Sequence, residues 1–289
     1  MSGTDSPEFL VIGHICQDRM PDGSLSLGGS VSYAATTGLQ MGCRVGVVTC
    51  TGPDLDLNEA LPNVQIARRE SAVTTEFENI YHDGDRTQYI HQRAEVIRCR
   101  DVPLSWRAAP MVYLGSIDRE IEPEVFFCFS EESLICLMPQ GFFRQWDETG
   151  LVSFAEWSPP EELLRRINVL VLSELDVPDP GALVENWRHL VEILVITHAE
   201  RGATVYQGDE ECLYPARPAR EVDLTGAGDV FAAAFLYHLT ETGDPCQSAG
   251  FANVAASYSI EGRGVIAIPP RQKVEAYLNT EMTRPPAQT

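Results

Sequence analysis

Short apolar runs rich in β-branched residues alternate with helical patterns along most of the chain. The first fifty residues show this alternation in full, with a strand predicted over 8–12, a helix over 31–41 capped by Ser30, and a second strand over 45–51. A strand, a glycine-rich turn, a helix and a strand in this order indicate a βαβ unit. We therefore expect an α/β fold, in which a doubly wound, mostly parallel central sheet is flanked by helices.

The same alternation continues towards the C-terminus. The later apolar runs are short enough for buried parallel strands, and helical patterns fill the intervals between them. Binding sites in such sheets lie beyond the carboxyl ends of the strands, so functional side chains are expected there. These strands are predicted over 111–114, 134–138, 169–172 and 193–197, and the helices over 161–166, 181–190, 229–239, 246–259 and 271–278.

Two hairpins interrupt this pattern. One joins residues 74–81 to residues 88–91 through a glycine turn, and the other joins residues 204–207 to residues 211–214. The first hairpin is more polar than the other strands. It is therefore expected to form an exposed sheet that covers another part of the molecule, rather than a core element.

The length bounds the domain organisation without deciding it. A chain of 289 residues is enough for one large α/β domain or two small ones. The pattern favours a single domain over residues 8–280, with two β excursions at about 14–30 and 72–93 that together make a small lid. Residues 281–289 are expected to form a flexible tail.

The charge limits the choice of partners. The net charge is −21, so a nucleic-acid backbone or an anionic membrane would be repelled, and neither is expected as a partner. Lys273 is the only lysine, and arginine supplies the remaining positive charge. No earlier lysine is available to bind phosphate or to form a Schiff base, which excludes several classes of enzyme.

The cysteines form no recognisable framework. There are eight of them, with no C-x-x-C pair and no Cys/His zinc pattern. No signal peptide opens the chain, and no apolar run reaches the roughly 18 residues that span a bilayer. We therefore expect reduced thiols and a cytoplasmic location.

The segment 223–229, Asp-Leu-Thr-Gly-Ala-Gly-Asp, carries the strongest chemical signal. Gly226 and Gly228 precede an apolar helical run, so the unpaired N–H groups of the first turn form an anion site. Asp229 lies beside that site, where a carboxylate is suited to remove a proton from a nucleophile that attacks the anion. The plainer interpretation is an ordinary glycine turn with an acidic residue at the helix start.

This heptapeptide resembles the Asp-Thr-x-Gly-Ala-Gly-Asp signature of the ribokinase/PfkB family of sugar, polyol and nucleoside kinases, with Leu224 in place of the threonine. The resemblance extends from Phe9 to Leu278. It implies a ribokinase-like fold and an ATP-dependent transfer of phosphate to a hydroxyl group. The family's catalytic base falls on Asp229, and its anion hole falls on the amides of Gly226, Ala227 and Gly228.

The resemblance also implies a substrate site near the N-terminus. Gly28 and Gly29 match the family's di-glycine motif, and Asp18 matches a carboxylate that binds substrate hydroxyls. Ser30 stands where many sugar kinases have Asn, which argues against a usual sugar. The polar hairpin matches the family's lid, which excludes water from the reaction, and Arg86 is a candidate contact on it.

A nucleotide site is implied in the C-terminal half. Residues 195–203 resemble the family's nucleotide-binding strand and turn, with Ala199 in place of a glycine, and residues 251–256 resemble the helix beside the adenine. Asp176 would hold Mg²⁺, although Ser173 replaces the Asn of the usual metal motif. The implied cofactors are ATP and Mg²⁺, and the resemblance also allows a monovalent cation. The nucleotide-binding residues are Thr197, Ala199, Gly202, Thr225 and Asn253.

Several alternatives remain open at this point. The Gln140-Gly141 pair and its neighbours resemble the myo-inositol kinase branch, although Met138 replaces an Asp of that branch. Gln140 is therefore a candidate substrate contact, and a cyclic polyol or sugar is the preferred acceptor. The alternatives are a nucleoside kinase of the same fold, a pseudokinase that binds ligands without turnover, and a dinucleotide-dependent oxidoreductase. The last is disfavoured because no Gly-x-Gly-x-x-Gly motif follows the first predicted strand. Either a monomer or a homodimer is compatible with the sequence.

Overall fold

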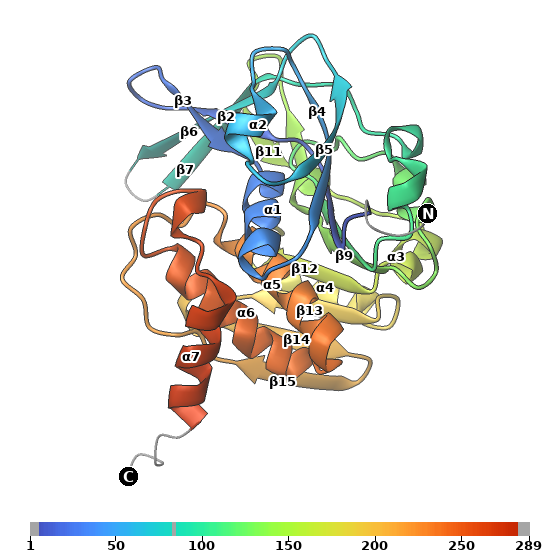
Figure 1. Ribbon diagram of the computed structural model, residues 1–289, viewed down its shortest axis with the longest axis vertical. Helices are drawn as coiled ribbons and strands as arrows, with labels where there is room; N and C mark the ends of the chain where they lie inside the picture. The colour runs from blue at the N-terminus through green and yellow to red at the C-terminus, as the bar shows by residue number, and fades with distance from the viewer. Residues whose placement is uncertain (1–5, 83–84, 283–289) are drawn as a thin grey trace.

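A nine-stranded sheet runs through the computed structural model, which describes residues 6–82 and 85–282 (Figure 1). The strand order is β15-β14-β13-β12-β9-β8-β1-β4-β5, and all pairs are parallel except β13–β14 and β14–β15. The direction of winding reverses at β1, which lies between β4 and β8. The strands are β1 (Phe9–Ile12), β4 (Val45–Thr51), β5 (Gln65–Glu70), β8 (Met111–Gly115), β9 (Leu134–Met138), β12 (Val169–Ser173), β13 (Ile193–Thr197), β14 (Ala203–Gln207) and β15 (Glu210–Tyr214).

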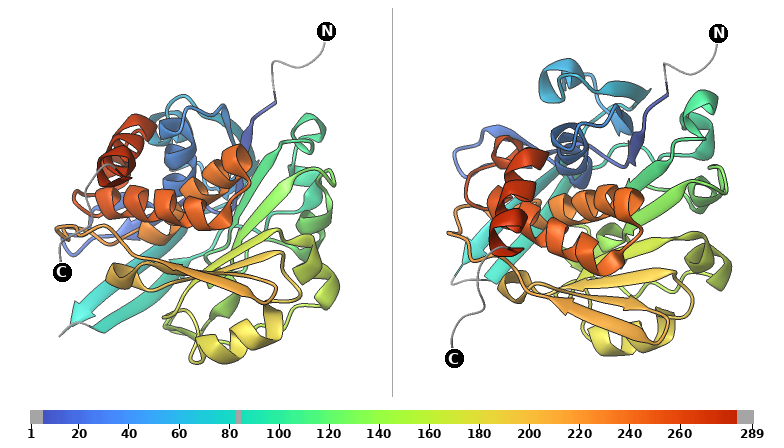
Figure 2. Two further views of the ribbon diagram at one scale, coloured as in Figure 1. Left: turned by 90° about the horizontal axis from the view of Figure 1, so that it is seen from below. Right: turned by 60° about the horizontal axis from the view of Figure 1, so that its bottom comes forward.

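Helices cover both faces of this sheet, as Figure 2 shows. The odd residues of β1, such as Phe9, pack on the side of α1 and α5, whereas Leu10 packs in a separate core on the other side. Burial on both faces explains why the strands read as continuous apolar runs. The helices are α1 (Ser30–Gln40), α2 (Leu57–Ala60), α3 (Glu161–Arg166), α4 (Pro180–Trp187), α5 (Ala227–Thr242), α6 (Pro245–Ser259) and α7 (Arg271–Met282).

A second sheet of four strands projects from the carboxyl edge of the main sheet (Figure 1). Its order is β3-β2-β6-β7, and it unites the N-terminal excursion with the polar hairpin. We call it the lid. Its strands are β2 (Cys16–Arg19), β3 (Leu25–Gly28), β6 (Thr75–His82) and β7 (Asp85–Gln92), and a separate small sheet pairs β10 (Arg144–Trp146) with β11 (Val152–Phe154). Residues 83–84 of the expected turn, and residues 283–289 of the expected tail, lie outside the described residues.

The predicted start of α1 is wrong in one respect. Gly29, with φ of 89°, occupies the N-cap, and Ser30 is already the first helical residue. Its hydroxyl makes no cap hydrogen bond but contacts Tyr113 and Asp229 instead. The polar side chain that looked like a cap is therefore part of the candidate site.

The prediction of reduced thiols is wrong for one pair. Cys212 in β15 and Cys246 at the start of α6 form a disulfide, with their Cα atoms 6.3 Å apart. A separation of 34 residues matches no recognised motif, so spacing did not reveal the pair. The other six cysteines are free. Within the described residues, no helix is both long and apolar enough to cross a bilayer.

Candidate active site

The turn that begins α5 lies at the carboxyl edge of the main sheet. Gly226 is the N-cap in the left-handed conformation, with φ of 76°. A Cβ atom at this position would overlap the ring of Tyr33, so only glycine fits. Within the described residues, the N–H groups of Gly226 and Gly228 have no backbone acceptor, whereas that of Ala227 lies 3.3 Å from the carbonyl of Leu224. At least two amides are thus available to an anion.

Asp229 lies in the first turn of α5 and points towards the start of α1. Its Oδ1 atom accepts a hydrogen bond from the hydroxyl of Tyr113 at 2.8 Å and a second, short one from Ser30. The two hydroxyls also contact each other at 2.9 Å. This pair of donors fixes the orientation of the carboxylate, and neither donor bonds to Oδ2.

The surroundings of Asp229 favour its neutral form on balance. Burial raises the pKa of this carboxyl, and the charge of Asp176 adds to the rise. The hydrogen bonds from Ser30 and Tyr113 oppose it, as does the charge of Arg144. The net effect raises the pKa of the Asp229 carboxyl above its ordinary value, and a raised pKa suits a group that takes up a proton during a reaction.

Asp176 follows β12 at the same edge of the sheet. Its Oδ2 atom accepts the N–H of Ser173 at 2.8 Å, and its Oδ1 atom accepts the side-chain amide of Gln140 at 3.1 Å. The structure thus brings together Asp176, Gln140 and Asp229, which are far apart in the sequence. Carboxylates are the ligands that Mg²⁺ prefers, so Asp176 and Asp229 could hold the expected ion, with the charge of Arg144 also acting on both.

Asp18 lies on the lid, against the di-glycine turn. Its carboxylate packs so closely on Gly28 that a Cβ atom there would overlap it, and a Cβ at Gly29 would lie 2.7 Å from the carbonyl of His14. The two glycines therefore let the lid strand approach α1. Burial raises the pKa of Asp18 to about 6, against the opposing charges of Arg86 and Arg144.

The register of the lid strands defines the face that carries Asp18. Asp18 lies opposite Phe77 in β6, and strand alternation places Asn79, Gln88 and Arg86 on this same face. The guanidinium group of Arg144 lies over the ring of Phe77, 5.7 Å from its centre. This face of the lid therefore carries amide, carboxylate and guanidinium groups, which are suited to hydrogen-bond the hydroxyl groups of a ligand.

Sequence reasoning missed two side chains of this site. Tyr113 lies in the apolar run of β8, where nothing marks it as polar-facing. Arg144 follows the Gln140-Gly141 pair, and that proximity was the available signal. Its Nη1 atom donates to the carbonyl of Ile117 at 2.9 Å, and no described carboxylate forms an ion pair with it. Burial, together with the charge of Arg86, lowers the pKa of Arg144 to about 10.

The expected nucleotide-binding residues lie at the end of β13, in the turn before β14, in the turn before α5 and in α6. Thr197 ends β13, and Thr225 donates its N–H to Asp223 at 3.0 Å. The Asn253 amide donates to the carbonyl of Tyr214 at 2.8 Å and thus fastens α6 to β15. Gly202 has φ of 100°, and a Cβ atom there would overlap the carbonyl of Tyr214.

Ala199 adopts a left-handed conformation, with φ of 52°, where the family motif has glycine. We expect Ala199→Gly to stabilise the protein by about 0.5–1 kcal/mol. Relief of the left-handed strain contributes about 1–2 kcal/mol, and the greater freedom of glycine in the unfolded chain offsets about 0.4–1 kcal/mol. Urea unfolding measures the change. Ala182→Gly, in the ordinary helix α4, is the control and should destabilise by about 1 kcal/mol.

The chain is similar to known kinases over most of its length. Residues 174–272 match the family model described as "pfkB family carbohydrate kinase". The chain is 26% identical to the cytidine kinase of Thermococcus kodakarensis over 253 residues, which cover 79% of this chain and 87% of that one. The C-terminal part of the chain therefore resembles the PfkB family. The matched segment contains Asp176 and the whole of the α5 turn.

Two further likenesses concern inositol. The chain is 25% identical to the inositol 3-kinase of Arabidopsis thaliana over 267 residues, covering 88% of this chain and 74% of that one. A solved structure of a pyrophosphate-dependent kinase of the ribokinase family, complexed with a pyrophosphate analogue and myo-inositol, matches with a TM-score of 0.77. That match covers 93% of this chain and 99% of the other at 22% identity, and confirms the ribokinase-like fold.

Proposed function

We propose that this chain is a PfkB-family kinase that transfers the γ-phosphate of ATP to a hydroxyl group of a small polyol or sugar, with Asp229 as the general base. The observation that carries the proposal is the position of Asp229, whose carboxylate is oriented by two hydroxyls beside the unpaired amides of Gly226 and Gly228. A base next to an anion site is what phosphoryl transfer to an alcohol requires.

Each group has a separate role in this reaction. The acceptor hydroxyl lies between the lid and Asp229, whose carboxylate takes the proton as the oxygen attacks phosphorus. The amides of the α5 turn stabilise the negative charge on the transferred group. Arg144 can also stabilise this negative charge, since its guanidinium lowers the pKa of both Asp18 and Asp229 and therefore lies close to both carboxyls. Mg²⁺ held near Asp176 would neutralise the phosphates.

Exposed apolar side chains around the α5 turn support a nucleotide as the donor. Ile266 is 91% exposed, Leu224 60% and Val222 46%. They lie on two segments joined by hydrogen bonds, since Val222 donates to the carbonyl of Ile260 at 2.8 Å and Gly264 to Asp223 at 3.4 Å. A nucleoside base would cover such an apolar surface, whereas pyrophosphate carries no apolar or aromatic group that could pack against it.

The proposal is tested by product formation from a donor–acceptor panel. We expect phosphorylated product with ATP and Mg²⁺ from myo-inositol or another cyclic polyol, and less from cytidine or ribose. Pyrophosphate in place of ATP serves as the rival donor. Faster turnover of pyrophosphate than of ATP would contradict the choice of donor, and turnover of cytidine alone would favour a nucleoside kinase.

Removal of the Tyr113 hydroxyl should shift the pH dependence of the reaction. In Tyr113→Phe, Asp229 loses a hydrogen bond that lowers its pKa, so its pKa rises and more of the base is protonated at a given pH. The acid limb of the kcat profile should therefore move to higher pH, with a loss of about tenfold on that limb. Tyr237→Phe is the control, since that hydroxyl bonds to Glu241 at 2.7 Å, further along α5. An unchanged acid limb would contradict this role.

A further inference from the structure

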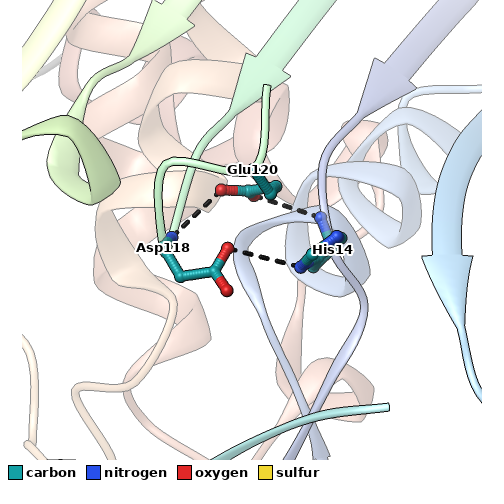
Figure 3. Close-up of side chains that lie close together, drawn as sticks. All are labelled: His14, Asp118 and Glu120. Atoms are coloured by element: carbon teal, nitrogen blue, oxygen red, sulfur yellow. Dashed lines mark hydrogen bonds and ion pairs between the residues drawn. The ribbon is translucent and has the colours of Figure 1, made fainter. Parts of the chain in front are cut away.

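A buried group of charged side chains lies where the lid joins the main sheet (Figure 3). His14, Asp118 and Glu120 are each at most 1% exposed. None of them belongs to the site described above. Buried charges are costly, so an arrangement of this kind needs a reason.

The group joins three of the connections between lid and body. His14 lies between β1 and the lid strand β2, and Thr75 begins the lid strand β6. Arg93 directly follows β7, and its Nε atom donates to Asp118 at 3.0 Å. Asp118 and Glu120 lie in the loop after β8, which belongs to the body. Lid strands therefore meet the main sheet through this network.

The hydrogen bonds of Glu120 argue against a bound metal ion. Its two oxygens accept the N–H groups of His14, Ile117 and Asp118 and the hydroxyl of Ser116, at 2.9–3.2 Å. Donors surround the carboxylate, so few lone pairs remain for a cation. The positive charge is supplied by the protein itself, through Arg93 on one side of Asp118 and His14 on the other.

The contacts of His14, above all the carboxylate oxygen that faces Nδ1, favour a proton on both ring nitrogens. Nε2 lies 3.0 Å from the carbonyl of Glu95, which can only accept. Nδ1 lies 2.9 Å from Thr75 Oγ1 and 3.3 Å from Asp118 Oδ1. That carboxylate oxygen is buried and has no ordinary hydrogen bond from the described residues, so a neutral ring would leave it facing a lone pair.

We propose that His14 is a buried imidazolium and that the network Arg93–Asp118–His14–Glu120 is a charged hinge that holds the lid against the main sheet. His14 and Arg93 are thus positioning residues that act through the lid. The hinge also reaches the acceptor side, because the loop after β8 accepts the Arg144 guanidinium at Ile117 and the N–H of Gly141 at Ser116. This inference does not depend on the proposed reaction.

The electrostatics agree in direction. Burial lowers the pKa of His14, but the charges of Asp118 and Glu120, together with the hydrogen bonds to Asp118 and to the Glu95 carbonyl, outweigh burial and raise the net pKa above 6.5. A group with a raised pKa stabilises the fold below its unfolded pKa of about 6.5 and loses that contribution as pH rises through the folded value. The groups facing His14 are Asp118, Glu120, Thr75 and the Glu95 carbonyl, and the thiol of Cys16 lies nearby.

Two measurements on the whole protein test the hinge without any substrate. In protein labelled with ¹⁵N-histidine at pH 7, the His14 signal, assigned by its loss in His14→Gln, should have the shifts of a ring protonated at both nitrogens. In hydrogen exchange, Arg93→Gln should lower the protection of the lid strands β6 and β7 at least tenfold, relative to β12 and β13. Arg93 is 34% exposed, so its replacement leaves the core intact.

A matched control lies on the other face of the lid. His91 pairs with Glu78 at 2.7 Å, and both side chains are partly exposed. His91→Gln should leave lid protection within about twofold of the wild type, since it does not touch the hinge. A neutral His14 ring at pH 7 would overturn the proposal. So would lid protection in Arg93→Gln equal to that of the control.

Discussion

Asp229→Asn should lower kcat about 10³-fold, within the range usual for loss of a general base. Asparagine keeps an oxygen that can accept from Tyr113 and Ser30, so the local hydrogen bonds and the fold should survive. The amide cannot take the acceptor's proton. Product formation from ATP and myo-inositol measures the loss, and the binding of an ATP analogue should be retained.

The control for this variant is Asp209→Asn. Asp209 is 98% exposed in the turn between β14 and β15, so the same change of charge there should leave kcat within about twofold of the wild type. If Asp229→Asn turned over as fast as this control, Asp229 would not be the base. If neither protein phosphorylated any acceptor while both bound nucleotide, the chain would be a pseudokinase.

Gly226→Ala should destabilise the protein by about 3 kcal/mol and weaken donor binding. The left-handed conformation costs a residue with a Cβ atom about 1–2 kcal/mol, and overlap with the Tyr33 ring adds about 1–3 kcal/mol. The turn must move to relieve the overlap, so its amides leave the position in which they meet the phosphate. Denaturant unfolding and nucleotide titration give the two results.

Gly208→Ala separates conformation from overlap. Gly208 also has a positive φ, of 58°, but nothing lies within 4 Å of a Cβ atom there. This variant should lose only about 1 kcal/mol and keep nucleotide binding unchanged. Equal losses in the two variants would show that contact with Tyr33 contributes nothing.

The sequence predicted the main sheet well because its signals are local. Burial on both faces makes β1, β8, β12 and β13 continuous apolar runs, and helical periodicity marks α3 and α6. The ends of elements were less certain, since Gly29 forms the N-cap of α1 through a backbone geometry that a residue pattern does not record. Ser30 was predicted to be the N-cap because serine hydroxyls often cap helices. In the structure this hydroxyl donates a hydrogen bond to the Asp229 carboxylate instead.

The part of the candidate site that lies in one sequence motif could be predicted, whereas the part that the fold brings together from distant segments could not. Asp229, Gly226 and Gly228 lie within four residues of one another, so the sequence alone predicted that they form one site. The hydrogen bond between Tyr113 and Asp229 joins residues 116 positions apart, and the electrostatic interaction of Arg144 with Asp18 depends on the position of the lid. The hinge at His14 draws on four separate segments, so no window of sequence contains it.

The bond between Cys212 and Cys246 limits which parts of the protein can move. Because β15 is covalently linked to α6, and Asn253 links the two again through the Tyr214 carbonyl, we expect these two elements to move together as one rigid unit. A movement of the lid relative to the main sheet would therefore leave the packing of β15 against α6 unchanged.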